Sequence, residues 1–188
     1  DHKSFEASSM DFYAVCSNLE TGQAEYIKCR KMDKTGLVYV RASASMPFVS
    51  QISEVNGKKY LDGGICDSIP LHAFQKMGYE RCVVVQTRAA GYQKKPNKLG
   101  WLAPLVYRKY PKFAAAIKNR HIMYNNELEQ IEQAQKNGAA FVIRPSKNVK
   151  IHHMETDKKV LQAVYDLGRG DAIKLLPELK KFLKEAKK

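Results

Sequence analysis

The sequence predicts an α/β fold in which helices cover a partly parallel sheet. Short apolar runs such as residues 82–87 (CVVVQT) alternate with amphipathic stretches such as residues 125–138 (NNELEQIEQAQKNG), and the chain contains no internal repeat. Alternation of strands with helices is typical of this layered fold class. With 188 residues the chain is long enough for a buried core. We therefore expect one domain over residues 1–188, with a helical C-terminal end at 155–188.

The N-terminal third begins with a predicted hairpin. Residues 11–18 (DFYAVCSN) and 23–29 (QAEYIKC) are extended runs that flank the turn LETG. Residues 35–46 (TGLVYVRASASM) leave two alternatives open, because LVYV is typical of a strand while RASAS is typical of a closely packed helix. Pro47 ends this element in either case.

A second predicted hairpin leads to an aspartate followed by two glycines. Asn56 and Gly57 separate two extended runs, which is a strong signal for a two-residue hairpin turn. The second run (KKYLD) ends at Asp62, and Gly63 and Gly64 follow it. Glycine permits positive φ and lets another group approach the backbone closely.

A helix is predicted over residues 69–78 (IPLHAFQKMG). Asp67 or Ser68 would cap its N-terminus, and Asp67 is interpreted as a cap rather than a catalytic group. Pro70 lies in the first predicted turn, and Gly78 ends the helix.

This helix connects two strands into a predicted βαβ unit. The run at 82–87 is typical of a strand buried on both faces, and residues 139–145 (AAFVIRP) form another such strand. The order of strand, helix and strand predicts a partly parallel sheet. Asp62 would then lie at the carboxyl end of a strand, where open α/β sheets bind ligands.

The remaining segments are a loop and the closing helices. Residues 88–112 form a predicted loop rich in glycine, proline, lysine and aromatic residues. Two helices are predicted at 156–168 and 170–186, with a kink or a restart at Pro177. The apolar face of the last helix comprises Leu175, Leu176, Leu179, Phe182 and Leu183.

The loop at 88–112 also carries a candidate contact with lipid. Trp101 and Leu102 lie close in sequence to Arg108 and Lys109, a mixture that suits a segment at the surface of an anionic membrane. The alternative is a helix that packs its apolar side on the core while its basic residues stay in water.

The composition bounds the partners and the compartment. The formal net charge of +13 favours an anionic partner, or else a solvated lysine surface. No motif of a nucleic-acid-binding domain occurs, so nucleic acid is not an expected partner. The four cysteines lack CxxC spacing, and no apolar run approaches the roughly 20 residues of a spanning helix. We expect reduced thiols in a cytoplasmic protein that contacts the inner membrane surface at most peripherally.

The residues alone leave two readings of Asp62 open. One is an Asx-type turn without chemistry, which is a common role of an Asp-Gly pair. The other is a catalytic acid at the end of a strand.

Three stretches resemble the patatin-like phospholipase family, in particular its bacterial cytoplasmic branch. They are RASASMPF, NGKKYLDGGICDSIP and VVVQTRAAGY. The opening strand pair and the closing helices are similar too, so the resemblance spans nearly the whole chain. Its most specific element is Asp-Gly-Gly after a strand, about 15 residues beyond an AS-x-S-x-P segment. The resemblance implies a layered α/β/α patatin-like sheet.

The resemblance also implies a Ser-Asp dyad that hydrolyses lipid or other carboxylic esters without metal or organic cofactor. In the family, a serine on a G-x-S-x-G turn attacks the acyl ester, and the aspartate of a D-G-[GA] motif acts as base. By this match Asp62 is the base, and Gly63 and Gly64 complete the motif. His152 and His153 are not expected to bind a metal, because adjacent side chains of an extended segment point to opposite faces.

The nucleophile of such a dyad is missing from the 188 residues. No G-x-S-x-G and no glycine-rich oxyanion loop occur, and Ser43 and Ser45 are not substitutes because no such turn surrounds them. We therefore interpret the chain as the C-terminal portion of the domain and expect it to be inactive in isolation.

A domain split at this point should expose apolar strand surface. We expect an apolar edge or face at 82–87 or within 11–18, and self-association or association with the missing N-terminal part. The alternative to a portion of an enzyme is a non-catalytic module that binds anionic lipid or an acidic partner.

Overall fold

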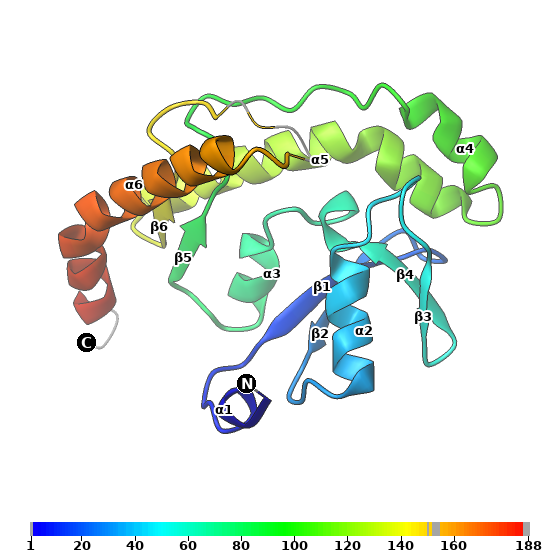
Figure 1. The fold of residues 1–188 in the computed structure, drawn as a ribbon, viewed down its shortest axis with the longest axis horizontal. Coiled ribbons are helices and arrows are strands. Elements are labelled where there is room, and N and C mark those ends of the chain that lie inside the picture. Colours follow the sequence, from blue (N-terminus) through cyan, green and yellow to red (C-terminus); the bar gives the residue numbers. More distant parts are fainter. Residues whose placement is uncertain (1, 150, 152–154, 186–188) are drawn as a thin grey trace. The chain divides into compact units, whose positions relative to one another are not determined.

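The computed structural model describes residues 2–149, 151 and 155–185. Helices and strands alternate along the chain, and the structure contains both antiparallel and parallel strand pairs (Figure 1). These features confirm the predicted α/β class.

The chain divides into two compact units. One comprises residues 1–69 and 94–126, and the other comprises residues 70–93 and 127–188. The long helix α5 (Pro111–Lys136) contributes residues to both units. The expectation of a single domain over the whole chain stays a prediction.

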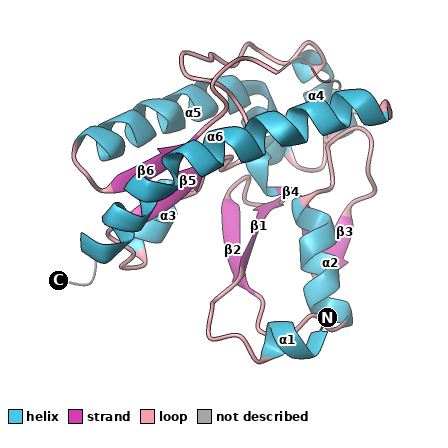
Figure 2. Cartoon of the chain, turned by 60° about the vertical axis from the view of Figure 1, so that its left-hand side comes forward, coloured by secondary structure: helices cyan, strands magenta, loops and turns pink. Residues whose placement is uncertain are grey.

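The first unit is built on a four-stranded antiparallel sheet with the strand order β2-β1-β4-β3. Asn56 and Gly57 connect β3 to β4 with φ angles of 50° and 74°, as a two-residue turn of type I′ requires. Both predicted hairpins are thus confirmed. The strands are β1 (Tyr13–Asn18), β2 (Ala24–Lys28), β3 (Ser53–Val55) and β4 (Lys58–Asp62) (Figure 2).

The ambiguous segment before Pro47 is a helix, α2 (Lys34–Ser43), and the short helix α1 (His2–Glu6) precedes the sheet. The carboxylate of Asp33 caps α2 by accepting a hydrogen bond from the backbone N–H of Gly36 at 2.9 Å. Ala42 of α2 is fully buried in a cluster with Cys16 and Tyr60 of the sheet. A small residue at this position lets α2 pack closely on the sheet.

The main core of the first unit joins the sheet to the segment that follows residue 94. The predicted loop at 88–112 is therefore only partly correct, since it contains η2 (Gly100–Leu102) and α4 (Ala103–Val106), and α5 begins within it. This segment is ordered because its apolar residues complete the core. The buried cluster comprises Leu19, Leu61, Ile65, Ala103, Tyr107, Phe113, Ala114 and Ile117.

The second unit contains a pair of parallel strands, β5 (Cys82–Val85) and β6 (Ala140–Ile143), with the helices α3 (Leu71–Lys76) and α6 (Lys158–Glu185). The prediction that 58–62 and 82–87 share a sheet is wrong. β4 already pairs with β1 on one edge and β3 on the other, so β5 pairs with β6 instead.

The strand β5 is not buried on both faces, contrary to the prediction. Val84 is 7% exposed, whereas Val83 and Val85 are 40% and 70% exposed. With only two strands in this sheet, one face packs and the alternating residues of the other face remain accessible. An apolar strand face at 82–87 was expected for a split domain, and self-association through it stays a prediction.

The helix α6 is continuous through Pro177, whereas two helices were predicted. Asp171 accepts a hydrogen bond from the backbone N–H of Ser146 at 2.7 Å, and the ring of Phe182 lies 5.6 Å from that of Phe141. Asp171 lies before Pro177 and Phe182 lies after it, so each half of α6 contacts another segment of the second unit. Leu176 and Leu183, which belong to the predicted apolar face, are exposed.

No helix among the residues that the structure describes is long and apolar enough to cross a membrane.

Candidate functional site

Asp62 is the last residue of β4 and lies opposite Cys16 of β1 in the antiparallel register. Its backbone N–H donates to the carbonyl of Ser45 at 2.9 Å. Its own carbonyl accepts a hydrogen bond from the hydroxyl of Ser17 at 2.8 Å. The backbone of Asp62 is therefore held from both sides, which fixes the direction in which the side chain leaves the sheet.

The two carboxylate oxygens of Asp62 differ in their contacts. Oδ1 accepts a hydrogen bond from the backbone N–H of Gly64 at 2.8 Å and so caps the short helix η1 (Gly63–Ile65). Oδ2 accepts no hydrogen bond from any residue in the described part of the chain. The side chain is half-buried. The Asx-type turn is thus present, and it leaves one oxygen able to accept a proton.

The two glycines after Asp62 serve different purposes. A Cβ on Gly63 would lie 2.0 Å from the carbonyl oxygen of Val15 in β1, so only glycine fits there. A Cβ on Gly64 would meet its nearest neighbour, Oδ1 of Asp62, at 3.2 Å. Alanine would therefore need only small shifts of side chains at Gly64, whereas it would clash with the backbone at Gly63. Neither glycine has a positive φ, and the close approach of another group to the backbone occurs at Gly63.

The carbonyl of Gly64 accepts two hydrogen bonds that the sequence did not indicate. Nε of Arg120, on α5, donates to it at 2.6 Å, and the hydroxyl of Ser68 donates to it at 2.6 Å. Arg120 is 56 positions from Gly64 in the chain and is half-buried. A single arginine among many basic residues carries no sequence signal for this contact.

Neither Asp67 nor Ser68 caps the helix α3, contrary to the prediction. The helix begins after Pro70 without a side-chain cap, and Gly78 follows its end with a φ of 97°. Asp67 instead accepts a hydrogen bond from the hydroxyl of Tyr26 in β2. Asp67 and Ser68 thus make their side-chain hydrogen bonds to Tyr26 and Gly64, and not to the first turn of α3.

Cysteine and serine side chains near Asp62 are poor nucleophiles. Burial raises the pKa of Cys16 to about 12, and burial also raises the pKa of Cys66. Both remain thiols at neutral pH. The hydroxyls of the buried Ser17 and Ser45 donate to backbone carbonyls, those of Asp62 and Arg41 respectively.

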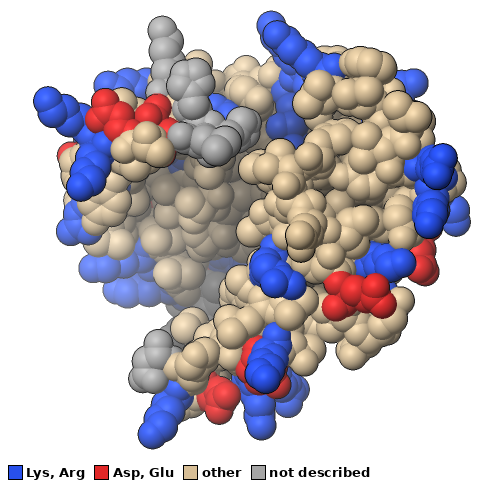
Figure 3. Space-filling model, turned by 45° about the vertical axis from the view of Figure 1, so that its right-hand side comes forward, with Lys and Arg blue, Asp and Glu red and all other residues tan. Residues whose placement is uncertain are grey.

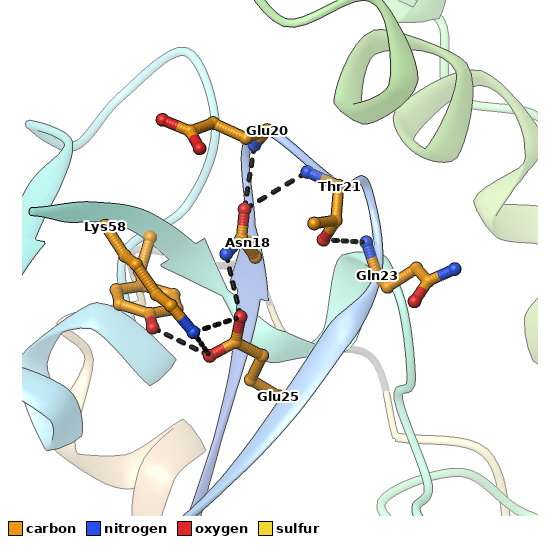
Figure 4. A network of polar contacts seen from close by, with 7 residues as sticks. Asn18, Glu20, Thr21, Gln23, Glu25 and Lys58 are labelled. Atoms are coloured by element: carbon orange, nitrogen blue, oxygen red, sulfur yellow. Dashed lines mark hydrogen bonds and ion pairs between the residues drawn. The ribbon is translucent and has the colours of Figure 1, made fainter.

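A second carboxylate, Glu25 of β2, lies in the same sheet (Figure 4). It accepts hydrogen bonds from Nδ2 of Asn18 at 2.7 Å, from the hydroxyl of Tyr60 at 2.8 Å and from Nζ of Lys58 at 3.1 Å. Burial raises the pKa of Glu25, but these hydrogen bonds together with the charge of Lys58 outweigh it and lower the pKa below its usual value. Both oxygens of Glu25 are occupied.

Three of the four predicted lipid-contact residues, Trp101, Arg108 and Lys109, are exposed on the first unit. Trp101 is 74% exposed and Leu105 is 71% exposed, while Leu102 is half-buried. Arg108 and Lys109 are exposed on the same segment. The buried positions of this segment are taken by other residues, so Trp101 and Leu105 do not serve the core.

Cationic side chains elsewhere are not gathered into one patch on the face drawn in Figure 3, where they occur in separate groups. In the described ranges, no group of three or more His, Cys, Asp or Glu side chains could hold a metal ion. His152 and His153 lie outside the described residues.

Two family models match the chain. Residues 13–74 match the family described as Patatin-like phospholipase. Residues 110–184 match a family described as Domain of unknown function (DUF6363). No curated protein matches the chain. The first match confirms the patatin-like resemblance over the segment that holds Asp62, Gly63 and Gly64, and the second includes Arg120.

Proposed function

We propose that this chain, a patatin-like family member by its match over residues 13–74, supplies the catalytic base Asp62 of a serine acyl hydrolase. The family is one of lipid acyl hydrolases, and the proposed substrates are lipids or other carboxylic esters. One observation carries the assignment of the base. Asp62 is fixed through Oδ1 by the Gly64 N–H at 2.8 Å, while Oδ2 has no hydrogen-bond partner within the described residues.

The proposed reaction proceeds through an acyl-enzyme. A serine hydroxyl, from polypeptide outside the 188 residues, attacks the ester carbonyl while Asp62 accepts its proton. The C–O bond to the alcohol breaks, and the leaving oxygen takes that proton. Water then attacks the acyl-serine and gives a proton to Asp62, and this proton returns to the serine as the acid leaves. Each step needs Oδ2 within about 2.6–3.2 Å of the hydroxyl or water.

The fixed backbone position of Asp62 favours this role. A carboxylate is a weak base toward an alcohol, so it must be held in a fixed direction within hydrogen-bond reach of the hydroxyl. An aspartate on a mobile loop would lack that fixed direction. The hydrogen bonds of Asp62 to Ser45 and Ser17 supply the fixed direction.

The test compares Asp62→Asn with Asp67→Asn in a protein that also contains the G-x-S-x-G segment. Hydrolysis of a short p-nitrophenyl ester should fall by roughly 100-fold or more in Asp62→Asn, the typical contribution of a general base. Asp67→Asn should retain activity, because Asp67 binds Tyr26 and not the proposed site. Retained turnover in Asp62→Asn would reject Asp62 as the base.

The isolated 188-residue chain gives a second check. It should neither hydrolyse the ester nor react with a fluorophosphonate probe, because it lacks the nucleophile turn. Stoichiometric labelling of this chain by the probe would contradict the assignment of the nucleophile to another stretch of polypeptide.

A second candidate function is contact with an anionic lipid surface, which the exposure of Trp101 and Leu105 supports. Aromatic and aliphatic side chains enter the headgroup region, while Arg108 and Lys109 attract anionic lipid. Trp101→Ala combined with Lys109→Ala should reduce co-flotation with vesicles that contain phosphatidylserine.

The control for the flotation experiment is Tyr165→Ala combined with Lys174→Ala on α6, which removes an exposed aromatic residue and an exposed lysine elsewhere. The control variant should bind these vesicles as the wild type does. The proposed lipid contact would be rejected if the Trp101→Ala, Lys109→Ala variant and the wild type bound the vesicles equally.

A further inference from the structure

Arg120 connects the two segments of the chain that match different families. It lies on α5, within residues 110–184, and its contact is Gly64, within residues 13–74. Both residues belong to the first compact unit. We propose that Arg120 is a positioning residue for the catalytic base. By holding the Gly64 carbonyl it fixes the turn, and with it the adjacent Gly63–Gly64 peptide group, whose N–H directs Asp62; this inference rests on the proposed function.

The geometry of the turn supports a positioning role. Nε of Arg120 donates to the Gly64 carbonyl at 2.6 Å, a charge-assisted hydrogen bond of the stronger kind. A terminal guanidinium nitrogen lies 3.3 Å from the point where a Cβ on Gly64 would stand, and Oδ1 of Asp62 lies 3.2 Å from that same point. The guanidinium and the carboxylate therefore both lie close to the same face of Gly64.

Arg120 does not neutralise Asp62 directly. Among the described residues, Asp62 takes part in no ion pair, and the hydrogen bond of Arg120 goes to the backbone. An arginine paired with the carboxylate would occupy the oxygen that must accept the proton. An arginine bound to the neighbouring peptide fixes the turn and leaves Oδ2 accessible.

The packing of α5 fixes Arg120 in turn. Phe113, Ile117 and Arg120 follow one another at spacings that place them on one face of the helix. Phe113 and Ile117 are buried in the same cluster as Leu61 and Ile65, which flank the Asp-Gly-Gly turn on both sides. The helix that carries Arg120 is thus anchored on the residues adjacent to Asp62. The first part of the segment 110–184, which matches the domain of unknown function, therefore supports the position of Asp62.

Arginine should be more effective than lysine at this position. Nε is part of a rigid planar fork, whereas a lysine ammonium is a point charge on a flexible stem. Arg120→Lys is therefore expected to keep the positive charge and to lose part of the positioning effect. Arg120→Ala should lose the charge and the whole positioning effect.

The activity test uses a protein that contains the G-x-S-x-G segment. Arg120→Ala should lower kcat for a p-nitrophenyl ester by roughly 10-fold or more, as expected for the loss of one hydrogen bond to a charged group. KM should change less than about 2-fold, because the interaction orients the base and does not bind substrate. The kcat of Arg120→Lys should lie between that of Arg120→Ala and that of the wild type. Guanidinium added at millimolar concentration should restore part of kcat in Arg120→Ala. Lys118→Ala, an exposed neighbour on α5, is the matched control.

A structural readout in the 188-residue chain separates this inference from the proposed function. Amide hydrogen exchange at Gly64 should be roughly 10-fold faster in Arg120→Ala than in the wild type. Exchange at Ile131, elsewhere on α5, should stay unchanged. Arg120→Lys provides the same comparison if the alanine variant does not fold.

The possible results have distinct meanings. Faster exchange at Gly64 together with a lower kcat supports the positioning role. Unchanged exchange at Gly64 and an unchanged kcat in both Arg120 variants would overturn it, even where Asp62→Asn abolishes activity. Faster exchange at Gly64 together with full activity in both Asp62→Asn and Arg120→Ala would leave Arg120 as a support of the turn and reject both the proposed base and its positioning.

Discussion

Glu25 and Asp62 are two carboxylates of one four-stranded sheet, yet their hydrogen-bond partners differ. Glu25 accepts hydrogen bonds on both oxygens, from Asn18, Lys58 and Tyr60. Asp62 accepts one hydrogen bond on Oδ1, and its Oδ2 has no hydrogen-bond partner in the described part of the structure. Glu25 lies in the interior of β2, whereas Asp62 lies at the end of β4.

The comparison teaches how one sheet holds one carboxylate with both oxygens occupied and another with one oxygen still available. A carboxylate with every acceptor position filled stabilises the fold and has no capacity left for a new proton donor. A carboxylate fixed through one oxygen keeps its orientation while the other oxygen stays available. Both carboxylates lie opposite Cys16 in the sheet, so the difference comes from the donors that reach them. Three side chains reach Glu25, whereas the backbone N–H of Gly64 reaches Asp62.

The largest expected effect concerns the turn that holds Asp62 in place. Gly63→Ala would place a methyl group 2.0 Å from the backbone oxygen of Val15. The free energy of unfolding should fall by about 3 kcal/mol or more, because a backbone atom of a central strand cannot move aside easily. Urea denaturation followed by circular dichroism measures this change in the 188-residue chain.

Gly64→Ala is the matched control for that experiment. Its methyl group would meet Oδ1 of Asp62 at 3.2 Å and Arg120 at 3.3 Å, contacts that small shifts of side chains relieve. The free energy of unfolding should change by less than about 1 kcal/mol. Equal destabilisation by the two substitutions would show that the close packing at Gly63 does not hold the turn.

An intermediate effect is expected from removing each carboxylate in turn. Glu25→Gln places an amide N–H₂ group among donors, so the free energy of unfolding should fall by about 1–3 kcal/mol. Asp62→Asn keeps an oxygen that can accept the Gly64 N–H, so its free energy of unfolding should change by less than about 1 kcal/mol. A larger loss in Asp62→Asn than in Glu25→Gln, measured by thermal or urea denaturation, would contradict the conclusion that Glu25 stabilises the fold more than Asp62 does.

The smallest expected effect is a pH dependence of stability. Hydrogen bonds hold the folded-state pKa of Glu25 below its ordinary value of 4.5. The stabilisation by Glu25 is therefore fully present above pH 4.5 and is lost as the pH falls through the lower, folded-state pKa. The stability difference between the wild type and Glu25→Gln should shrink over this acidic range.

Stability must be compared between the wild type and Glu25→Gln, because the pKa of a second acid, Asp171, is also lowered. The hydrogen bond from the Ser146 N–H lowers the pKa of Asp171, so both proteins lose stability from this residue in acid. The difference between them isolates Glu25. A difference that stays constant down to pH 2 would contradict the lowered pKa.

The candidate site was only partly predictable from the sequence. Asp62 and the two glycines follow from a local pattern, since a strand, an acid and two small residues are adjacent in the chain. Arg120 could not be found in this way. Its contact depends on how α5 packs on β4, and the sequence gives no pairing between positions so far apart.

The wrong predictions for residues 82–87 and for Asp67 have one physical cause. Residues 82–87 are apolar enough for a doubly buried strand, but their burial depends on how many strands and helices surround β5. Asp67 is a suitable helix cap by type and position, but the Tyr26 hydroxyl of another strand binds it. In both cases a partner distant in sequence decided the outcome.

The sequence by itself determined the hairpin turn at Asn56 and Gly57, the α/β class and the position of an acid at a strand end. These features arise from backbone conformations and periodicities that neighbouring residues impose. Only the tertiary structure decided that α2 is a helix on the sheet, that Glu25 is saturated while Asp62 is not, and that Arg120 holds the turn. Those outcomes depend on hydrogen bonds and packing between segments that meet only after the chain has folded.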